Sequence, residues 1–457
     1  MIDLYGFLFQ RVLYPGLQSG LKRRPTLDHL RELERTQWCS LDELQALQER
    51  ELGRLLAHVF QNVPYLRDRY RSAGLDPVDV HHLEDLAKLP LLTRDDAREH
   101  FAERRSIAAP FASIDKKTSG TTGRPLAFAY DAGSEYWRQA TKLRGYGWAG
   151  YQLGDTSIHY WGSPSLEPPP LGRRLKESVD HSFRREHYVD CTERSEAALD
   201  RVVERVRRIK PKVIVCYAQA GAALARHVNA KGARDWADIN VICAAERLFP
   251  SDRSAMVQAF GPGVFETYGN REVMLMAAEC EAHAGLHQSM ENLIVEVLVR
   301  EGDRQRPAEP GEPGEVAITD LHNFGAPFVR YLTGDLAVAR VNERCACGRW
   351  LTRLERIEGR STETLRDAQG NPVSGMFFSV LFAYLADKVR EFQVIQRRDN
   401  AIDLRLVPVG TLDDSLLQAI KDHIGKYVPG VPLRSEVVSE LLPDRTGKRR
   451  VVVVEKN

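Results

Sequence analysis

Apolar residues recur at helical spacing in the first hundred residues of the chain. They follow a 3.6-residue period in 27–33 and again in 52–59. Pro64, Pro77 and Pro90 interrupt the pattern, and proline cannot continue the interior of a helix. The pattern therefore predicts several separate helices in this region, not one long coiled coil.

From about residue 115 onward, short apolar runs alternate with longer amphipathic stretches. The runs at 213–216 and 241–243 are continuously apolar, which is typical of strands covered on both faces. The stretches at 197–209 and 220–230 have helical spacing. This alternation predicts a mostly parallel sheet with crossover helices.

A later block is richer in strands. We expect strands at 293–299, 315–319 and 336–341, because each is a short run rich in apolar and β-branched residues. The segment 301–314 is crowded with Pro, Gly, Arg and Glu, so we expect an exposed hairpin loop there. The block predicts a β-rich part of the same domain.

After residue 360 the pattern changes again. Strands are predicted at 392–396, 402–407 and 451–454, with a helix at 412–424. The fold class is therefore α/β, with two domains. A large N-terminal domain, 1–359, has mostly parallel sheets, crossover helices and a smaller β-rich part. A small, mobile α+β domain, 360–457, follows it.

The composition narrows the class of function. The 457 residues carry 64 Lys and Arg against 63 Asp and Glu, a formal net charge of +1, which lacks the basic excess of a nucleic-acid-binding protein. No apolar run approaches the roughly 18 residues of a membrane span, and a signal-peptide layout is missing. Seven cysteines are an odd number and do not form a disulfide framework. We therefore expect a cytoplasmic protein, whose oligomeric state the sequence does not give.

One segment points to a phosphate ligand. It consists of Thr118, Ser119, Gly120, Thr121, Thr122 and Gly123, and Arg124 follows it. Small residues let backbone N–H groups converge on phosphate oxygens, and the hydroxyls and the cation add donors. The Lys-Ser/Thr ending of a Walker loop is missing. Composition alone leaves two interpretations, a phosphate-binding loop or a surface turn.

Five motifs appear in one order along the chain. They are the loop at 118–125, then Ala244-Ala245-Glu246 with Glu266-Thr267-Tyr268-Gly269 and Glu272, then Tyr331-Leu332-Thr333-Gly334-Asp335, then Gly359-Arg360, and finally Pro443-Asp444-Arg445-Thr446-Gly447-Lys448. In these motifs the sequence resembles the adenylate-forming superfamily of acyl-CoA ligases, synthetase adenylation domains and luciferases. It is most similar to the phenylacetate–CoA ligase branch, including the CapK-like capsule-biosynthesis relatives. The resemblance covers nearly the whole chain and implies a nucleotide and acid site within 115–359, after a helical region at 1–100.

The resemblance also implies a role for each motif. The loop from Thr118 to Gly123 would hold the β- and γ-phosphates of ATP. Arg360 would bond the ribose side and report nucleotide occupancy to the hinge, as a catalytic residue with Glu272 and Lys448. Residues that would line the nucleotide and magnesium site are Ala245, Glu246, Glu266, Thr267 and Gly269. Tyr268 would stack on adenine, Asp335 would accept from the two ribose hydroxyls, and Glu272 would hold Mg²⁺. Lys448 would bridge the carboxylate and the α-phosphate in the adenylation step.

Cysteines and a histidine offer a second candidate site. Cys345 and Cys347 lie on one Cys-x-Cys-Gly turn that can chelate an ion, and Cys280 and His287 lie upstream. Three thiolates and one imidazole would complete a closed, structural zinc site that braces a helix expected after the adenine motif. His283 is a competing ligand, and a set of buried free cysteines is the alternative. The remaining cysteines, Cys39, Cys191, Cys216 and Cys243, are expected to be buried thiols.

Together these observations predict an ATP-dependent ligase that activates an organic acid, aryl by resemblance, as acyl-AMP and passes it to coenzyme A. The expected cofactors are ATP/AMP, Mg²⁺, a structural Zn²⁺ and coenzyme A. Related enzymes usually carry Asp or Lys two residues after the Gly-Arg pair, where this chain has Thr362. Two alternatives therefore stay open. The acyl or AMP group passes to an amine or hydroxyl, or the chain is a non-catalytic nucleotide-binding relative.

Overall fold

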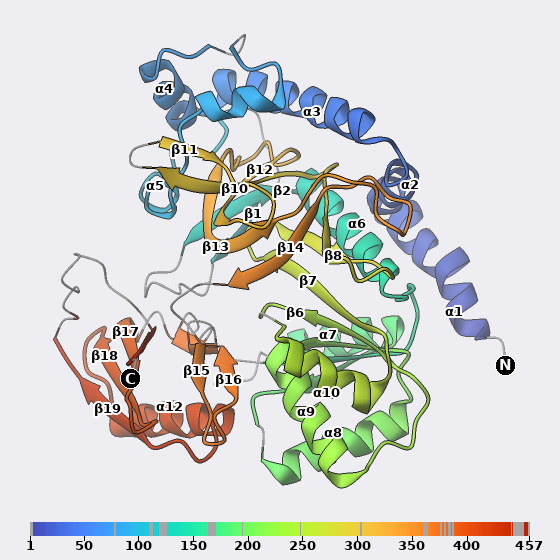
Figure 1. Cartoon of the computed structure of the whole chain (residues 1–457), viewed down its shortest axis with the longest axis vertical. Helices are drawn as coiled ribbons and strands as arrows, with labels where there is room; N and C mark the ends of the chain where they lie inside the picture. The colour runs from blue at the N-terminus through green and yellow to red at the C-terminus, as the bar shows by residue number, and fades with distance from the viewer. Residues whose placement is uncertain are drawn as a thin grey trace. The chain divides into compact units, whose positions relative to one another are not determined.

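The computed structural model is drawn in Figure 1. It describes residues 3–76, 79–108, 113–117, 126–162, 171–193, 195–246, 248–301, 304–359, 364–374, 377–378, 381–382, Leu385, 388–439, Leu441 and 452–455. The chain forms two compact units. Unit 1 contains Met1–Lys116, Ala127–Gly154 and Phe265–Gly359, and unit 2 contains Lys117–Leu126, Asp155–Val264 and Arg360–Asn457. Within the described residues, no helix is long and apolar enough to cross a membrane.

The N-terminal part of unit 1 is helical, as the apolar periodicity predicts. Its helices are α1 (Leu4–Leu8), the π-helical η1 (Phe9–Leu13) and η2 (Gly16–Leu21), α2 (Thr26–Thr36), α3 (Leu41–Asn62), α4 (Pro64–Ser72), the 3₁₀ helix η4 (Leu83–Lys88), α5 (Arg94–Glu99) and α6 (Ala132–Trp148). Local signals set the boundaries. Ser40 and Glu43 form a capping box at the start of α3, and Pro64 stands at the start of α4, where its missing N–H costs nothing.

Unit 2 contains the predicted parallel sheet. Its strands are β3 (Ser157–Trp161), β4 (Glu186–Asp190), β5 (Val213–Tyr217) and β6 (Asn240–Ala244), in the order β6-β5-β3-β4 and all parallel. The helices between them are α7 (Leu171–Arg184), α8 (Glu196–Ile209) and α9 (Ala218–Lys231), and α10 (Pro250–Phe260) follows β6. All five residues of β5 are buried, which explains its continuously apolar sequence.

Unit 1 also holds an antiparallel sheet. Its strands are β7 (Val264–Asn270), β8 (Met274–Glu279), β9 (Leu286–Gln288), β10 (Leu293–Glu301), β11 (Arg304–Pro307), β12 (Pro313–Asp320), β13 (Tyr331–Ala339) and β14 (Arg353–Gly359), in the order β11-β10-β12-β13-β14-β9-β8-β7. A short pair, β1 (Ser113–Lys117) and β2 (Ala127–Asp131), forms a separate sheet. The antiparallel sheet has more strands than the parallel one, whereas the sequence predicted a smaller β-rich part.

The segment 301–314 is not purely a loop. Its residues Arg304–Pro307 form β11, which pairs with β10. Arg306 explains why such a polar segment is ordered, because its guanidinium contacts carboxylate oxygens of Glu301 and Glu312, each at 2.7 Å. Ion pairs therefore contribute to the hairpin where the sequence lacks apolar residues.

The C-terminal segment has its own small sheet and core, as predicted. Its elements are β15 (Thr364–Arg366), β16 (Pro372–Ser374), β17 (Val389–Gln396), β18 (Ile402–Pro408), α12 (Asp414–Tyr427), β19 (Leu433–Val437) and β20 (Val452–Val454). The larger sheet has the order β19-β18-β17-β20. Asp413 caps α12 by accepting from the backbone N of Leu416 at 2.7 Å. A separate mobile domain at 360–457 stays a prediction.

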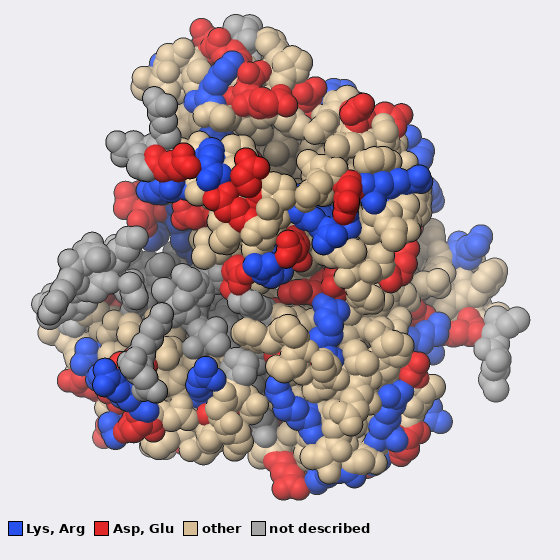
Figure 2. All heavy atoms as spheres, in the orientation of Figure 1, with Lys and Arg blue, Asp and Glu red and all other residues tan. Residues whose placement is uncertain are grey.

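Charged side chains are mixed on the surface. Figure 2 shows acidic and basic residues interspersed over the described part of the visible face. This distribution agrees with the formal net charge of +1.

Candidate nucleotide and metal sites

Glu272 lies on a tight turn between β7 and β8. A Cβ added at Gly269 would lie 2.0 Å from the carbonyl oxygen of Met274, so this position accepts only glycine. The side chain of Asn270 accepts a 3.0 Å hydrogen bond from the backbone N of Val273 and stabilises the turn. The expectation of a helix after this motif is wrong. Residues Met274–Glu279 form β8, which is paired with β7 on one side and β9 on the other.

The Glu272 carboxylate is buried beside a cation and a phenol. Its side chain is 5% exposed, and its Oε1 accepts from Arg94 Nη1 at 3.4 Å and from the Tyr331 hydroxyl at 3.3 Å. Both contacts with described residues go to Oε1, so Oε2 is the oxygen available to a cation. Arg94 comes from α5 and Tyr331 from the start of β13, so distant segments converge on this carboxylate.

A buried arginine is hydrogen-bonded to the backbone of the same turn. Arg138 on α6 donates to the backbone oxygen of Glu272 and forms an ion pair with Asp320, with 2.7 Å between Nη2 and Oδ2. Its guanidinium lies 4.0 Å from the ring centroid of Tyr130. Burial raises the pKa of Asp320, and the Arg138 charge opposes that shift. These contacts fix the position of Glu272 through its backbone.

Tyr268 and Asp335 come from two of the predicted motifs and are hydrogen-bonded to each other. The Tyr268 hydroxyl donates to Oδ2 of Asp335 at 3.0 Å. The backbone N of Asp335 donates to Thr333 Oγ1 at 3.2 Å, and Gly334 has φ +82°, a conformation that favours glycine. The Thr-Gly-Asp sequence thus forms a specific turn of backbone on β13, and Tyr268 orients the carboxylate.

The other predicted nucleotide residues lie on β7 and at the end of β6. Glu266 and Thr267 are buried, and the backbone N of Glu266 donates to the Glu279 side chain at 2.7 Å. Ala245 and Glu246 follow the carboxyl end of β6 in unit 2, and Ala245 has φ +68°, in the left-handed region. Open parallel sheets bind ligands at this edge.

Aromatic rings occupy the same edge of the unit 2 sheet. Trp161 ends β3, Tyr217 ends β5, and their ring centroids are 4.2 Å apart. The remaining predicted residues, Thr118, Ser119, Gly120, Thr121, Thr122, Gly123, Arg360 and Lys448, lie outside the described residues, as does Thr362.

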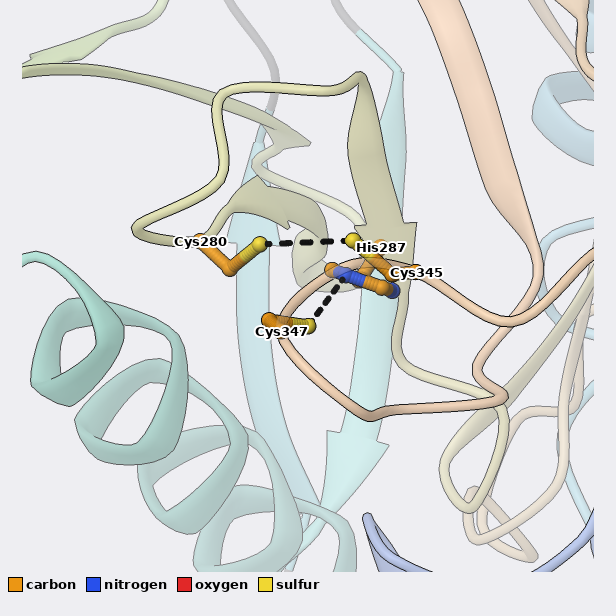
Figure 3. A group of neighbouring side chains, drawn as sticks. All are labelled: Cys280, His287, Cys345 and Cys347. Atoms are coloured by element: carbon orange, nitrogen blue, oxygen red, sulfur yellow. Dashed lines mark hydrogen bonds between the residues drawn. The ribbon is translucent and has the colours of Figure 1, made fainter.

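The four predicted zinc ligands come together in unit 1. The ligand atoms of Cys280, His287, Cys345 and Cys347 all lie within 4.8 Å of one another, and Figure 3 shows their side chains converging. Two of the contacts are Cys280 Sγ to Cys345 Sγ at 3.9 Å and Cys347 Sγ to His287 Nε2 at 3.4 Å. A tetrahedral zinc ion with ordinary bond lengths would separate two sulfurs by about 3.8 Å and a sulfur from a nitrogen by about 3.6 Å.

Strand pairing selects His287 over His283. His287 is opposite Ala278 in the antiparallel β8–β9 ladder, so Cys280, two positions after Ala278, is its diagonal neighbour on the same face. His283 instead lies on the intervening turn, with its ring centroid 4.7 Å from that of Phe265 and its Nδ1 3.5 Å from Glu279. The turn of Cys345 and Cys347 supplies the remaining thiols.

The protonation of His287 suits a metal ligand. Its Nδ1 lies 3.0 Å from the carbonyl oxygen of Leu351, which can only accept, so Nδ1 carries the proton and Nε2 keeps a lone pair. Burial lowers the pKa of His287 to about 4, with a further contribution from Arg353, so the ring is neutral at pH 7. Burial also raises the pKa of Cys280, and the neighbouring Cys347 thiol adds to this effect.

Packing around the four residues is apolar and aromatic. The ring of Trp148 meets that of His287 edge-on at 5.6 Å, and the Trp148 indole N–H donates to Gln37 at 2.8 Å. None of the seven cysteines forms a disulfide. Of the four that were predicted as core thiols, Cys191, Cys216 and Cys243 are buried, and Cys39 is half-buried.

Three contacts of Glu272 were not predicted from the sequence, those with Arg94, Arg138 and Tyr331. Tyr331 begins the Tyr-Leu-Thr-Gly-Asp motif, so the sequence did place this residue near the predicted nucleotide site. The two arginines lie in helices, Arg94 in α5 and Arg138 in α6, and a single sequence does not distinguish a buried helical arginine from a solvated one.

Comparison with known proteins agrees with this arrangement. The chain is 27% identical over 373 residues to a phenylacetate–coenzyme A ligase of Thermus thermophilus, covering 79% of this chain and 80% of the relative. It is 27% identical over 355 residues to that of Escherichia coli, covering 73% and 75%. No protein-family model matches the sequence.

Solved structures establish the fold. A 2-hydroxyisobutyryl-CoA ligase in complex with 2-HIB-AMP and CoA superposes with a TM-score of 0.59 at 19% identity, covering 92% of this chain and 91% of that one. Its postadenylation complex with 2-HIB-AMP gives a TM-score of 0.58. The narrower likeness to CapK-like relatives remains a prediction. The chain is thus a homologue of the phenylacetate–CoA ligases and has the fold of the adenylate-forming acyl-CoA ligases.

Proposed function

We propose that this protein is an ATP-dependent carboxylate ligase that forms an acyl-adenylate and then a coenzyme A thioester. Its homology to phenylacetate–CoA ligases over most of both chains supports this assignment. The structural observation that best supports it is the hydrogen bond between Tyr268 and Asp335. It joins two motifs that were identified separately in the sequence.

The reaction has two steps. A carboxylate oxygen of the acid attacks the α-phosphorus of ATP, and pyrophosphate leaves. The coenzyme A thiol then attacks the acyl carbon, loses its proton, and AMP leaves. Both steps bring anions together, so donors and cations must be positioned beforehand.

We assign the residue roles from the resemblance. The loop from Thr118 to Gly123 holds the β- and γ-phosphates, and Asp335 holds the ribose. Glu272 is the magnesium ligand, through the oxygen that does not contact Arg94 and Tyr331. Lys448 stabilises the charge that develops between the acid and the α-phosphate, and Arg360 contacts the nucleotide at the hinge. The small domain at 360–457 rotates between the two steps.

The cysteine and histidine group is a structural zinc site in this proposal. Its three thiolates and one imidazole leave no open position for substrate, as in closed zinc sites. The strand β8 separates Cys280 from the Glu272 turn, and its six residues span about 20 Å, so zinc does not reach the reacting atoms. Such an ion would hold β8, β9 and the 345–347 turn together.

The substrate is an organic acid, and an aryl acid is the first class to test because the relatives are named for phenylacetate. We place the enzyme in the cytoplasm, since seven cysteines without a disulfide suit a reducing compartment. A second candidate keeps the adenylation step but passes the acyl or AMP group to an amine or hydroxyl. Thr362, at a position where related enzymes usually carry Asp or Lys, favours that candidate.

Pyrophosphate release tests the proposal. Purified protein is supplied with Mg-ATP and aryl, fatty or hydroxy acids, with and without coenzyme A, and the thioester is measured by mass spectrometry. Acid-dependent release with thioester formation is expected. Lys448→Ala should abolish release, whereas the control Lys426→Ala on α12 should not.

The outcomes separate the candidates. Release that continues without thioester favours an amine or hydroxyl acceptor. If no acid of the panel stimulates release, the non-catalytic relative becomes the better description.

A further inference from the structure

The first helical segment of unit 1 has an apolar face that is exposed in the described part of the structure. It runs through α1, η1 and η2 from Leu4 to Leu21, at the end marked N in Figure 1. Its exposed large apolar side chains are Leu4, Tyr5, Phe7, Leu8, Val12, Leu13 and Leu21. Leu4, Leu8 and Val12 follow one another at a spacing of four, so they form one stripe. We call these seven side chains the outer face.

The opposite side of the segment is fixed to unit 1. Phe9 is fully buried, its ring centroid lies 5.5 Å from that of Tyr14, and a Cβ at Gly154 would approach it to 2.9 Å. The side chains of Gln10 and Gln152 are hydrogen-bonded at 3.3 Å. The segment is thus a packed part of unit 1 that has a second apolar side.

Such an outer face is unusual for a surface helix. Helices on a protein surface direct polar side chains outward, and contiguous exposed apolar side chains mark sites of interaction with membranes or proteins. Here Leu4 is 66% exposed and Phe7 and Val12 are each 56% exposed. No polar stripe runs along this side.

Charge indicates the kind of partner. Arg11, Lys22, Arg23 and Arg24 are all exposed, and among the described residues none forms an ion pair with a carboxylate. Asp3 is the only acidic residue in 3–24, and its carboxylate caps α1 by accepting from the backbone N of Gly6 at 3.0 Å.

We infer that the outer face and its four cations bind the surface of an anionic lipid membrane, with the segment lying in the plane of the interface. Apolar side chains enter the boundary between headgroups and acyl chains, and the cations contact lipid phosphates. A second copy of this chain fits less well, because each copy would bring four cations and one carboxylate that is already engaged. The site is separate from the proposed ligase chemistry.

Vesicle sedimentation tests this inference with the full chain. The probes are vesicles of phosphatidylcholine alone and vesicles with about a third phosphatidylglycerol. Sedimentation with the anionic vesicles only, weakened by salt, is expected. Replacing Lys22, Arg23 and Arg24 by Gln should weaken binding on the order of a hundredfold, since each cation contributes about fivefold.

Apolar variants separate insertion from simple charge attraction. Leu8→Glu with Val12→Glu should abolish binding, whereas Val341→Glu should not, although Val341 is 52% exposed and so matches Val12. Circular dichroism of each variant checks that the fold is retained. Equal binding by the Leu8→Glu, Val12→Glu variant and the wild type overturns the inference, and so does no binding at low salt. A dimer in analytical ultracentrifugation that these changes dissociate, without vesicle binding, also overturns it and assigns the face to a second copy.

Discussion

The hydroxyl of Tyr268 donates a 3.0 Å hydrogen bond to Oδ2 of Asp335, across 67 positions of sequence. The tyrosine is 6% exposed and the bond is partly buried. A carboxylate held in this way has lost its rotational freedom before a ligand arrives, and preorganisation of this kind strengthens binding. The bond therefore links the packing of β7 to the proposed ribose contact on β13.

We predict that Asp335→Asn lowers kcat/KM for ATP by about 10- to 150-fold, because a hydrogen bond to a charged group contributes about 1.5–3 kcal/mol. Tyr268→Phe keeps the carboxylate and loses only its orienting bond, so a smaller loss of about 2- to 10-fold is expected. Steady-state pyrophosphate release at varied ATP measures both values.

Tyr70→Phe is the matched control for the tyrosine. Tyr70 is fully buried on α4, and its hydroxyl has no hydrogen-bond partner within the described part of the chain. This variant should leave the KM for ATP unchanged. An unchanged KM in Asp335→Asn as well would remove Asp335 from the nucleotide site.

A second prediction concerns metal content. Protein purified without added zinc should contain about one equivalent of zinc per chain by mass spectrometry, because four ligand atoms lie within 4.8 Å. Cys347→Ala removes one ligand and should release most of the metal and lower Tm, since bound metal contributes to the stability of the folded state.

Cys243→Ala is the control, because it removes a buried thiol of the unit 2 sheet that lies outside the group. It should keep the full zinc content. Less than half an equivalent in the unmodified protein would instead indicate buried free cysteines.

The sequence predicted the elements that have strong periodicity. The run at 213–216 is apolar throughout because all of β5 is buried, and the helix period at 27–33 corresponds to α2. The convergence of the four predicted ligands was also predictable, because Cys345 and Cys347 lie on one turn and Cys280 and His287 lie on either side of the turn between β8 and β9. Local sequence was sufficient in each case.

The strand β8 could not be predicted in the same way. Its sequence Met-Leu-Met-Ala-Ala-Glu consists of good helix formers, yet pairing with β7 and β9 makes it a strand. The contacts of Glu272 with Arg94 and Arg138 span 178 and 134 positions of sequence. Tertiary packing decides such features, and a single sequence does not encode them as a local pattern.

A third prediction concerns pH. Trp137 lies between the rings of His29 and His322, with centroids 4.2 and 4.0 Å away. Burial lowers the pKa of His29 to about 4, His322 adds to the shift, and Asp28 opposes it. Between pH 6.5 and pH 4 the unfolded chain therefore binds more protons at this residue, so stability falls as the pH falls.

The size of this effect is on the order of 1 kcal/mol, because His29 is half-exposed and solvent screens its charge. Urea denaturation at several pH values measures it. The stability of the wild type relative to His29→Gln should decrease from pH 7 to pH 4.5. If the two proteins lose stability in parallel over this range, His29 does not titrate as described.

The last prediction concerns the buried ion pair of Arg138 and Asp320. Their side chains are 1% and 0% exposed, and 2.7 Å separates Nη2 from Oδ2. Asp320→Ala leaves the guanidinium charged and unpaired in the interior, so we expect the free energy of unfolding to fall by about 3–5 kcal/mol. Asp68→Ala removes an exposed partner of Arg67 and should change it by less than about 1 kcal/mol.

The same pair positions Glu272, because Arg138 also donates to the backbone oxygen of that residue. Asp320→Asn keeps the volume and a hydrogen-bond acceptor but removes the charge, so it should fold better than Asp320→Ala and still disturb the turn. We expect its pyrophosphate release to require more Mg²⁺ for half-maximal rate, with the KM for the acid unchanged. A variant that is destabilised but has the Mg²⁺ requirement of the wild type would show that the pair stabilises the fold without positioning Glu272.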